Sequence, residues 1–462
     1  MKKYSKKIVC IFVVALMIFS LTACVPNIQG NDNIEGDNDP FGKFNEMVTL
    51  KMVTTQDATV TSQVLPFTPG ESIRDNRFTR LFKDKLNIDI KYEWIANDAE
   101  DYKTKLDAMQ TVGKLPDTLI TDPAGIQDFV DAGLVQDMTQ YWEIYASPLL
   151  KEITQADGKG PFQAVTHDGK LYAIPQIYSS IDRAQFVWVR VDWIEKLNKE
   201  KGMNLSTHPS TLSDLLDIIS AFSANATFLG NSNGYGLSLQ GDIWSEMGNI
   251  KPIMNMLDAY PTIWTENSAG KAVYGSIQSQ VKDALKVLNT MYKNKEINQA
   301  FTTATEDTVA TDVTSGRSGV VFGEQWLCDY PLNNTTGSKA NWQSFTLMDN
   351  KSTQISMGTY GYWAVFNTCQ RPEAIIKLLN CYVENIWGSK ADFNTYYMPA
   401  DSGAAVWKLS PVKPEPPTKN LDAYLAIKNA KNNNQLDSLV GEPLSIYKNI
   451  QLYLNQSGAG WT

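Results

Sequence analysis

The chain has 462 residues, 43% of them hydrophobic, and a formal net charge of −9 at neutral pH. This length and apolar content are sufficient for two domains of ordinary size, each with its own core. The negative charge, with no basic block after the first residues, argues against nucleic acid as a partner.

The first 23 residues have the pattern of an export signal. Lysines at positions 2, 3, 6 and 7 precede an apolar run over residues 8–19, which is shorter than the ~20 residues of a membrane span. The run ends in Leu21-Thr22-Ala23-Cys24, which resembles the lipobox of bacterial lipoproteins. That resemblance implies cleavage before Cys24, acylation of its thiol, and anchoring in the cell membrane at the extracellular face. An ordinary signal peptide with an incidental cysteine is the alternative.

Residues 24–46 are predicted to be a flexible tether, because they are rich in Asn, Asp and Gly and have little to bury. Beyond the signal and the anchor, three cysteines remain: Cys328, Cys369 and Cys381. This sparse, odd set is neither a disulfide framework nor a zinc motif. We expect three buried thiols, with one disulfide as the alternative.

After the tether, strand and helix patterns alternate. Apolar periods of two and of 3.6 residues predict strands over 48–53, 87–94 and 117–121 and helices over 77–86, 101–112 and 123–133. This order predicts a parallel α/β arrangement, in which ligands bind at the carboxyl ends of strands.

The second half of the chain continues in the same way. Asp168-Gly169 predicts a hairpin turn, and Thr211 with Asp214 predicts the start of a helix. The remaining predicted elements are strands over 183–190, 318–326 and 361–367 and helices over 191–200, 280–293 and 372–387.

Catalytic constellations are scarce. The two histidines, His167 and His208, look like turn residues, so a Ser-His-Asp triad is not expected. Phosphate-loop and metal-ligand spacings are absent from the sequence, and we expect neither cofactor nor metal. A pair of catalytic carboxylates of the kind that glycoside hydrolases use remains an alternative, because acidic residues are plentiful.

An exported α/β chain with these features resembles an extracellular solute-binding protein of an ABC importer. The resemblance rests on residues 168–175 followed by 187–197, on 263–277 followed by 314–326, and on 361–380, which are similar to that family's three interlobe crossings. It is closest to the carbohydrate-binding branch of the LplA type. It implies a two-lobed periplasmic-binding-protein-like α/β fold of type II, with a cleft between the lobes. The family generally continues past an element like residues 460–462, so the second lobe is expected to be truncated.

The resemblance also implies a domain division and a function. The first lobe would comprise 47–177 and 316–351, and the second would comprise 178–315 and 352–462. The protein would be a monomer, not an enzyme, that captures an oligosaccharide and passes it to permease subunits in the membrane. The alternatives are a cell-surface glycoside hydrolase and a surface lipoprotein without a role in transport.

Sugar binding requires aromatic rings for the C–H faces and planar polar groups for the hydroxyls. Asp122 follows a strand, although capping the next helix is its alternative role, and Arg183 has surface pairing as its alternative. Strand alternation sends one of Tyr362 and Trp363 inward, and Trp326 is expected to have no core to join. The full set of candidate site residues is Asp122, Tyr178, Arg183, Trp244, Trp326, Tyr362 and Trp363.

Overall fold

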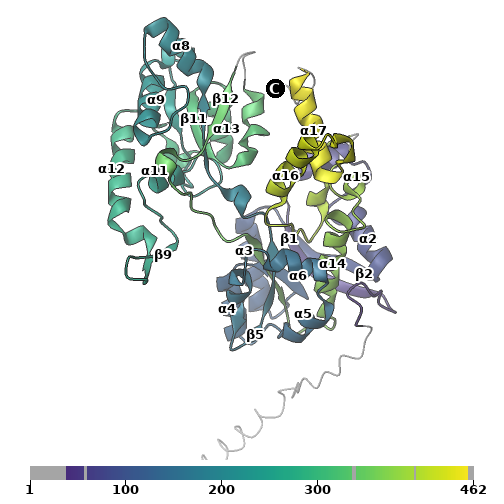
Figure 1. Cartoon of the computed structure of the whole chain (residues 1–462). Helices are drawn as coiled ribbons and strands as arrows, with labels where there is room; N and C mark the ends of the chain where they lie inside the picture. The colour runs from purple at the N-terminus through teal and green to yellow at the C-terminus, as the bar shows by residue number, and fades with distance from the viewer. Residues whose placement is uncertain (1–37, 57–59, 336–339, 400–401, 456–462) are drawn as a thin grey trace, which may run out of the picture.

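The computed structural model describes residues 38–455 apart from 57–59, 336–339 and 400–401. It has two lobes, each built from β-strands and helices around a core of its own (Figure 1). The predicted two-lobed α/β architecture is confirmed.

In the described residues, the first lobe contains three short sheets, of which the smallest is the hairpin of β4 and β5. Strands β1 and β2 pair in parallel, with Val48 opposite Ile88. Strand β13 lies between β3 and β6 and is antiparallel to both, so β3 and β6 run in the same direction and end at the same edge. The elements of this lobe are β1 (Val48–Thr55), α2 (Arg77–Leu86), β2 (Ile88–Ala96), α3 (Ala99–Thr111), β3 (Thr118–Thr121), α4 (Pro123–Asp131), α5 (Thr139–Tyr145), α6 (Pro148–Gln155), α7 (Gly160–Gln163), β4 (Thr166–His167), β5 (Lys170–Leu171), β6 (Ala173–Ile177), β13 (Thr359–Val365), α14 (Glu373–Ile386) and α15 (Phe393–Tyr396).

The second lobe has a four-stranded sheet in the order β12-β7-β11-β8 with helices on both faces. Along β7, Val187 and Val189 join the core under α8 and α9, whereas Trp188 joins a smaller cluster that includes Val309 and Val313 of α13. The elements of this lobe are β7 (Phe186–Arg190), α8 (Val191–Lys201), α9 (Leu212–Ala224), α10 (Ala226–Leu229), β8 (Tyr235–Ser238), α11 (Lys251–Met256), β9 (Trp264–Glu266), β10 (Ala272–Tyr274), α12 (Ser279–Lys293), α13 (Glu306–Thr314), β11 (Ser318–Gly323) and β12 (Trp342–Phe345).

The strand pairings correct the predicted domain division. Strands β11 and β12 lie in 316–351 but pair with β7 and β8 of the second lobe, and β13 lies in 352–462 but pairs within the first lobe. The predicted second crossing, 263–277 with 314–326, therefore lies wholly in the second lobe. The local patterns of these strands are alike, so they do not reveal which sheet each strand joins.

Three stretches meet at the junction of the lobes: residues 178–185, 351–358 and 411–418. The first two connect strands of different lobes. The third lies against the first, since the Ser179 amide donates to the Glu415 carboxylate at 3.2 Å and the Ser179 hydroxyl donates to the Pro417 carbonyl at 2.8 Å.

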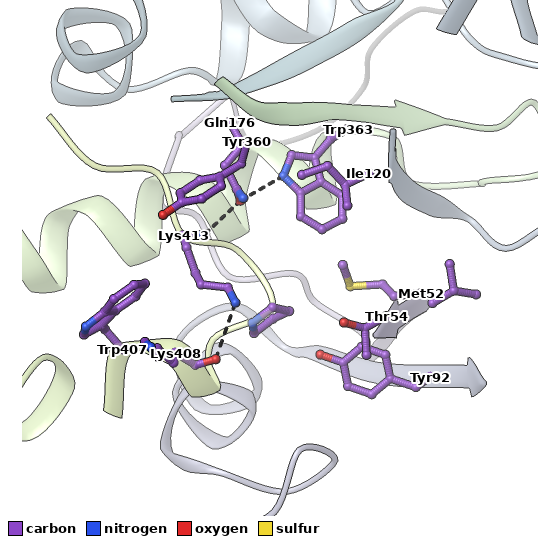
Figure 2. Close-up of a pocket in the computed structure, with 12 residues that line it drawn as sticks. Met52, Thr54, Tyr92, Ile120, Gln176, Tyr360, Trp363, Trp407, Lys408 and Lys413 are labelled. Carbon is purple, nitrogen blue, oxygen red and sulfur yellow. Dashed lines mark hydrogen bonds between the residues drawn. The ribbon is translucent and has the colours of Figure 1, made fainter. Parts of the chain in front are cut away.

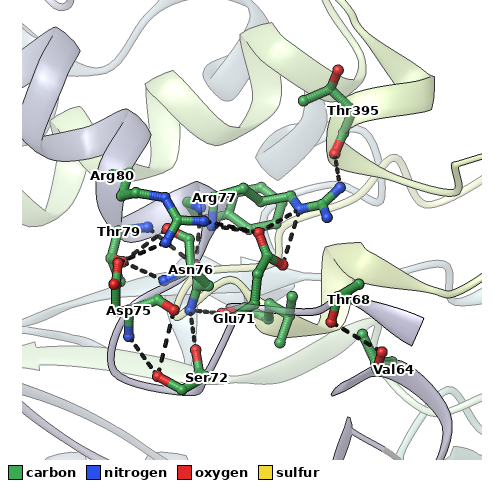
Figure 3. Close-up of polar contacts among 12 residues, drawn as sticks. Val64, Thr68, Glu71, Ser72, Asp75, Asn76, Arg77, Thr79, Arg80 and Thr395 are labelled. Carbon is green, nitrogen blue, oxygen red and sulfur yellow. Dashed lines mark hydrogen bonds and ion pairs between the residues drawn. The ribbon is translucent and has the colours of Figure 1, made fainter. Parts of the chain in front are cut away.

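Contacts around the start of α2 attach the segment after α14 to the first lobe (Figure 3). Asn76 caps this helix and donates from its amide nitrogen to the Leu409 carbonyl at 3.2 Å, while Arg77 donates to the Thr395 carbonyl. Helices α16 (Lys419–Asn432) and α17 (Gly441–Leu454) follow, and Tyr397 contacts Glu442 of α17 at 3.2 Å. The predicted assignment of residues 390–410 to the second lobe was therefore wrong.

Residues 38–46 are packed against the first lobe. The buried ammonium of Lys377 donates to the carbonyls of Asp39 and Gly42, both at 2.8 Å, and Asn380 donates to the Pro40 carbonyl at 2.9 Å. The Phe44 side chain is buried as well. The tether prediction was thus wrong for this stretch, while its earlier part and the predicted signal peptide and Cys24 lie outside the described residues.

No helix in the described ranges has both the length and the apolar character needed to cross a membrane. The described cysteines carry free thiols, of which Cys369 and Cys381 are buried as predicted and Cys328 is exposed, contrary to expectation.

Candidate functional site

A pocket of about 370 Å³ lies in the first lobe, at the edge where β1, β3 and β6 end (Figure 2). Its volume is within the ~300–1,000 Å³ that is typical of ligand sites. The 12 residues that line it are Met52, Val53, Thr54, Tyr92, Ile120, Gln176, Tyr360, Trp363, Trp407, Lys408, Pro411 and Lys413.

Aromatic rings reach this pocket from separate elements. Tyr92 belongs to β2, Tyr360 and Trp363 belong to β13, and Trp407 belongs to a short 3₁₀ helix, Val406–Leu409. The Trp407 ring is stacked on Tyr397, with centroids 5.9 Å apart and ring planes inclined by 16°. Packing of this kind fixes the ring before any ligand arrives.

Gln176 positions the inner wall of the pocket. Its side-chain carbonyl accepts hydrogen bonds from the Trp363 indole nitrogen at 3.2 Å and from the Lys413 amide at 2.8 Å, so it joins β6, β13 and the stretch after the 3₁₀ helix. The residue is 4% exposed. Among the described residues, its amide nitrogen has no acceptor, which makes it a donor for a ligand oxygen.

Two lysines stand at the outer side of the pocket. The Lys413 ammonium donates to the Lys408 carbonyl at 3.5 Å, and the Lys408 ammonium lies 5.7 Å from the Trp407 ring centroid. Figure 2 shows both side chains beside Trp407. None of the lining residues in the described chain is acidic.

The pocket adjoins the junction of the lobes. The Tyr360 ring lies 4.6 Å from the ring of Tyr178, and the Arg183 guanidinium lies 4.3 Å from the centroid of Tyr178. Arg183 also forms ion pairs with two carboxylates of the second lobe, Glu246 and, at 3.8 Å, Glu324. A continuous set of contacts therefore connects the pocket wall to the second lobe.

Glu324 follows β11 and is only 3% exposed. Burial, together with the nearby charge of Glu246, raises its pKa to about 7, although Arg183 and the Trp326 indole N–H oppose the shift. Burial also lowers the pKa of Lys251, which faces the same carboxylates. The second-lobe side of the junction thus contains carboxylates and an ammonium group that lie close together and are partly shielded from water.

The predicted site residues of the first lobe and the junction do not come together in one site. Trp363 lines the pocket, whereas the neighbouring Tyr362 is 1% exposed and does not. Tyr178 and Arg183 contact each other at the junction rather than line the pocket. Asp122 caps α4 through a 2.8 Å hydrogen bond from the Gly125 amide, which was its alternative role.

The two predicted tryptophans of the second lobe are half-buried. Trp244 packs against the main core of that lobe. Trp326 packs against a cluster that includes Met247, Val309 and Leu327, so the expectation that it has no core to join was wrong. The reason is that the 3₁₀ turn after β11, Gln325–Cys328, folds back over the sheet face that carries Val321.

Sequence reasoning missed most of the pocket. Tyr360 directly precedes the strand predicted over 361–367. Trp407, Lys408 and Lys413 fall in or beside a Pro-rich stretch, but the family resemblance was followed only to residue 397. The signal that the sequence offered for this part of the pocket was Trp407 directly before Lys408, in a segment without a clear helix or strand pattern. Groups of His, Cys, Asp or Glu suited to a metal ion do not occur in the described part of the chain.

Known structures support the fold. The chain is similar to the S. pneumoniae ABC-transporter substrate-binding protein FusA in complex with fructo-nystose (TM-score 0.57, 18% identity, 79% of this chain and 77% of that one). It is also similar to an HMO-binding solute-binding protein from Bifidobacterium longum infantis, with a TM-score of 0.54, 14% identity, and coverage of 90% of this chain and 93% of that one. A third similar structure is the galacto-N-biose/lacto-N-biose I-binding protein of Bifidobacterium longum, with a TM-score of 0.50, 18% identity, and coverage of 85% of this chain and 87% of that one. At these identities the likeness shows the fold, which is that of two-lobed sugar-binding ABC components.

No curated protein sequence matches the chain. A family model does, over residues 77–386, which is more than half of the chain, and its members are binding proteins of transport systems rather than enzymes. The protein therefore belongs to the family of bacterial extracellular solute-binding proteins.

Proposed function

We propose that the protein captures an oligosaccharide between its lobes and delivers it to the permease subunits of an ABC importer. The observation that carries the proposal is the first-lobe pocket, in which aromatic rings and a buried amide donor converge beside the junction. Three structural neighbours are described as binding fructo-nystose, HMO and lacto-N-biose, which supports a carbohydrate as the ligand.

The pocket has both kinds of group that a sugar requires. Trp363 and Trp407 offer faces on which the C–H side of a pyranoside ring can pack. Gln176, Thr54 and Tyr92 place amide and hydroxyl groups at the same edge, where they can exchange hydrogen bonds with sugar hydroxyls.

The proposed function also requires that the protein stays close to the permease in the cell. Cys24 is the lipid attachment point, and it holds the protein at the outer face of the cell membrane, close to the permease. The protein acts as a monomer. The lipobox-like residues 21–24 and the extracellular family support this placement.

Calorimetric titration with a panel of oligosaccharides tests the function. We expect stoichiometric binding of at least one sugar, which chromatography then recovers intact. Trp407→Ala should weaken that binding by about 1–3 kcal/mol, the scale of one large buried side chain. Trp264→Ala is the matched control, because Trp264 is 69% exposed on the β9–β10 hairpin.

Hydrolysis of the sugar would instead support the glycoside hydrolase alternative. Neither binding nor hydrolysis across the panel would favour a surface lipoprotein without transport. Equal loss of affinity in both tryptophan variants would remove the pocket as the binding site.

A further inference from the structure

Two of the most exposed apolar side chains in the described residues lie at one edge of the second lobe. Ile277, in the short turn that joins β10 to α12, is 79% exposed, and Trp264 of β9 is 69% exposed. Leu285 and Tyr292 of α12 are exposed as well. Figure 1 shows β9 at the tip of this lobe, beyond one end of α12. Exposed apolar side chains that gather in one region indicate an interaction surface, and we call residues 264–295 the α12 edge.

A row of lysines follows the solvent side of α12. Lys282, Lys286 and Lys293 are spaced by four and seven residues, so they lie on one face of the helix, and all three are exposed. On the opposite face, Ala284 and Met291 are buried in the core of the lobe. The helix is therefore fixed to the lobe with its lysines directed at whatever approaches this edge.

The α12 edge is positively charged, in contrast to the whole chain. Residues 264–295 contain five lysines and two acids, which gives a formal net charge of +3, whereas the chain carries −9. In the part of the chain that the structure describes, none of the five lysines forms an ion pair, and all of them are exposed. They are Lys271, Lys282, Lys286, Lys293 and Lys295. Such a surface attracts a partner of negative charge.

The acids that flank the edge do not neutralise it. Asp258, before the hairpin, forms an ion pair with Lys351 at 2.6 Å. Glu296, after α12, is buried and accepts a hydrogen bond from the Asn294 side chain at 3.4 Å. The positive charge of the edge therefore faces solvent.

We propose that the α12 edge docks on the surface of an anionic membrane. The lysines lie next to the phospholipid headgroups, and Trp264 and Ile277 reach the boundary between the headgroups and the acyl chains. Tryptophan is favoured at that boundary because its ring is apolar and its N–H can still meet water or a headgroup. Lysines near an anionic leaflet are attracted to it over about a Debye length.

A second copy of the chain fits this edge less well than a membrane does. In a symmetric dimer the same patch faces itself, so lysines of one copy would lie opposite lysines of the other. Like charges repel, and the edge has only Glu266 and Asp283 to separate them. An anionic membrane supplies negative charge for the lysines and an apolar boundary for the exposed rings and chains.

Docking goes beyond the proposed function, because it does not depend on the sugar. The family is extracellular and serves transport, so its members work beside a membrane. The proposed lipid at Cys24 precedes the first lobe, whereas the α12 edge belongs to the second lobe. Contact at both lobes fixes the orientation of the protein on the membrane, which one flexible attachment cannot do.

Cosedimentation with lipid vesicles tests the proposal. The sample is the chain from residue 24 onward with Cys24→Ala, which has neither the predicted export signal nor a thiol for acylation. The probes are vesicles of phosphatidylcholine alone and vesicles with about 40% phosphatidylglycerol. We expect binding to the anionic vesicles to be at least about tenfold stronger, and about 500 mM NaCl should remove most of that difference.

Charge variants assign the binding to the lysine row. The double variant Lys282→Gln/Lys286→Gln should bind anionic vesicles at least about fivefold more weakly. Lys103→Gln/Lys114→Gln is the matched control, because it removes two charges from exposed positions of the first lobe and should leave vesicle binding unchanged. Circular dichroism and thermal melts establish that each variant is folded.

Apolar variants test the second half of the surface. Trp264→Ala and Ile277→Ser should each weaken binding to anionic vesicles by about threefold or more, because less apolar surface enters the boundary. Val112→Ser is the control, since Val112 is exposed on the first lobe away from the edge. In wild type, the Trp264 fluorescence should shift to shorter wavelength on the anionic vesicles, and this shift should be absent in Trp264→Ala.

The other possible partners give different results. Equal binding to both kinds of vesicle, or equal losses in the edge and control variants, overturns the proposal. Sedimentation velocity without lipid covers self-association: a dimer that Trp264→Ala abolishes assigns the edge to a second copy instead. Binding only to native membranes, lost after protease treatment of those membranes, assigns it to a membrane protein. None of these results affects sugar binding, so docking and the proposed function fail separately.

Discussion

Arg183, in the first stretch that joins the lobes, forms an ion pair with Glu324 of the second lobe at 3.8 Å. Glu324 is almost fully buried, and burial raises its pKa to about 7 even with that arginine beside it. Desolvation of the carboxylate thus outweighs the attraction of its partner. The junction between the lobes therefore contains a group that titrates near neutral pH.

Glu324 should make the protein less stable as the pH rises from about 4.5 to about 7. The pKa is higher in the folded state than the ordinary carboxyl value, so the folded state binds more protons than the unfolded state in this window. Glu324→Gln removes this dependence. Relative to wild type, the variant should gain about 1–3 kcal/mol in the free energy of unfolding at pH ~8 compared with pH ~5.

Urea melts of both proteins at the two pH values measure this difference. Glu266→Gln, at an exposed position on β9, is the control and should follow the wild-type pH profile. Parallel profiles for Glu324→Gln and wild type would contradict the raised pKa.

Trp326→Ala should destabilise the second lobe. Its ring packs against a cluster that includes Met247, Val309 and Leu327, and truncation leaves a cavity there. Because the side chain is half-buried, we expect a loss of about 2–4 kcal/mol, slightly below the range for a fully buried tryptophan. Denaturant melts check this against Trp264→Ala, whose exposed ring should contribute less than about 0.5 kcal/mol. A stable Trp326→Ala protein would show that its core contacts are energetically minor.

Asn380→Ala should release the N-terminal segment from the first lobe. The Asn380 amide donates to the carbonyls of Pro40 and Tyr145 and accepts from the Ser147 amide, all in buried or half-buried surroundings. Removing it leaves these groups without this partner, at a loss of about 2–4 kcal/mol in the free energy of unfolding.

Hydrogen exchange of residues 38–46 and a denaturant melt measure this effect. Asn429→Ala on the exposed side of α16 is the control and should leave both unchanged. Unaltered exchange in Asn380→Ala would mean that the contacts of Lys377 alone hold the segment.

Cys24→Ala should release the protein from the membrane fraction or leave it unprocessed, because no thiol remains for acylation. Fractionation of cells followed by immunoblotting gives the distribution, and Cys328→Ala, which removes an exposed thiol of the second lobe, is the control. Correctly cleaved Cys24→Ala protein that still partitions fully with membranes would disprove the lipobox interpretation.

Local structure was predicted well from the sequence, because it depends on neighbouring residues. The helix predicted over 77–86 is α2, Thr211 and Asp214 form the predicted capping box, and Asp168-Gly169 turns with φ of 50° and 77°. Each of these features is set by side-chain periodicity, a cap or a backbone conformation that a short stretch determines by itself.

Lobe membership and the pocket were not predictable in this way. Which sheet β11 or β13 joins depends on partners more than 80 residues away, and their apolar patterns fit either lobe. The pocket likewise brings Tyr92, Gln176 and Lys413 together from three distant parts of the chain. Only Trp363 was recovered, since its strand was recognised even though its partners were not.

The contacts from Tyr360 through Tyr178 and Arg183 to Glu246 have a thermodynamic consequence. A ligand that displaces the Tyr360 ring and, through Tyr178, the Arg183 guanidinium would change the free energy of the ion pair at the far end. Such coupling is reciprocal, so a substitution at Glu246, which does not line the pocket, would then change ligand affinity as well. Through such contacts, ligand affinity would depend on the arrangement of both lobes, and part of it on residues that do not line the pocket.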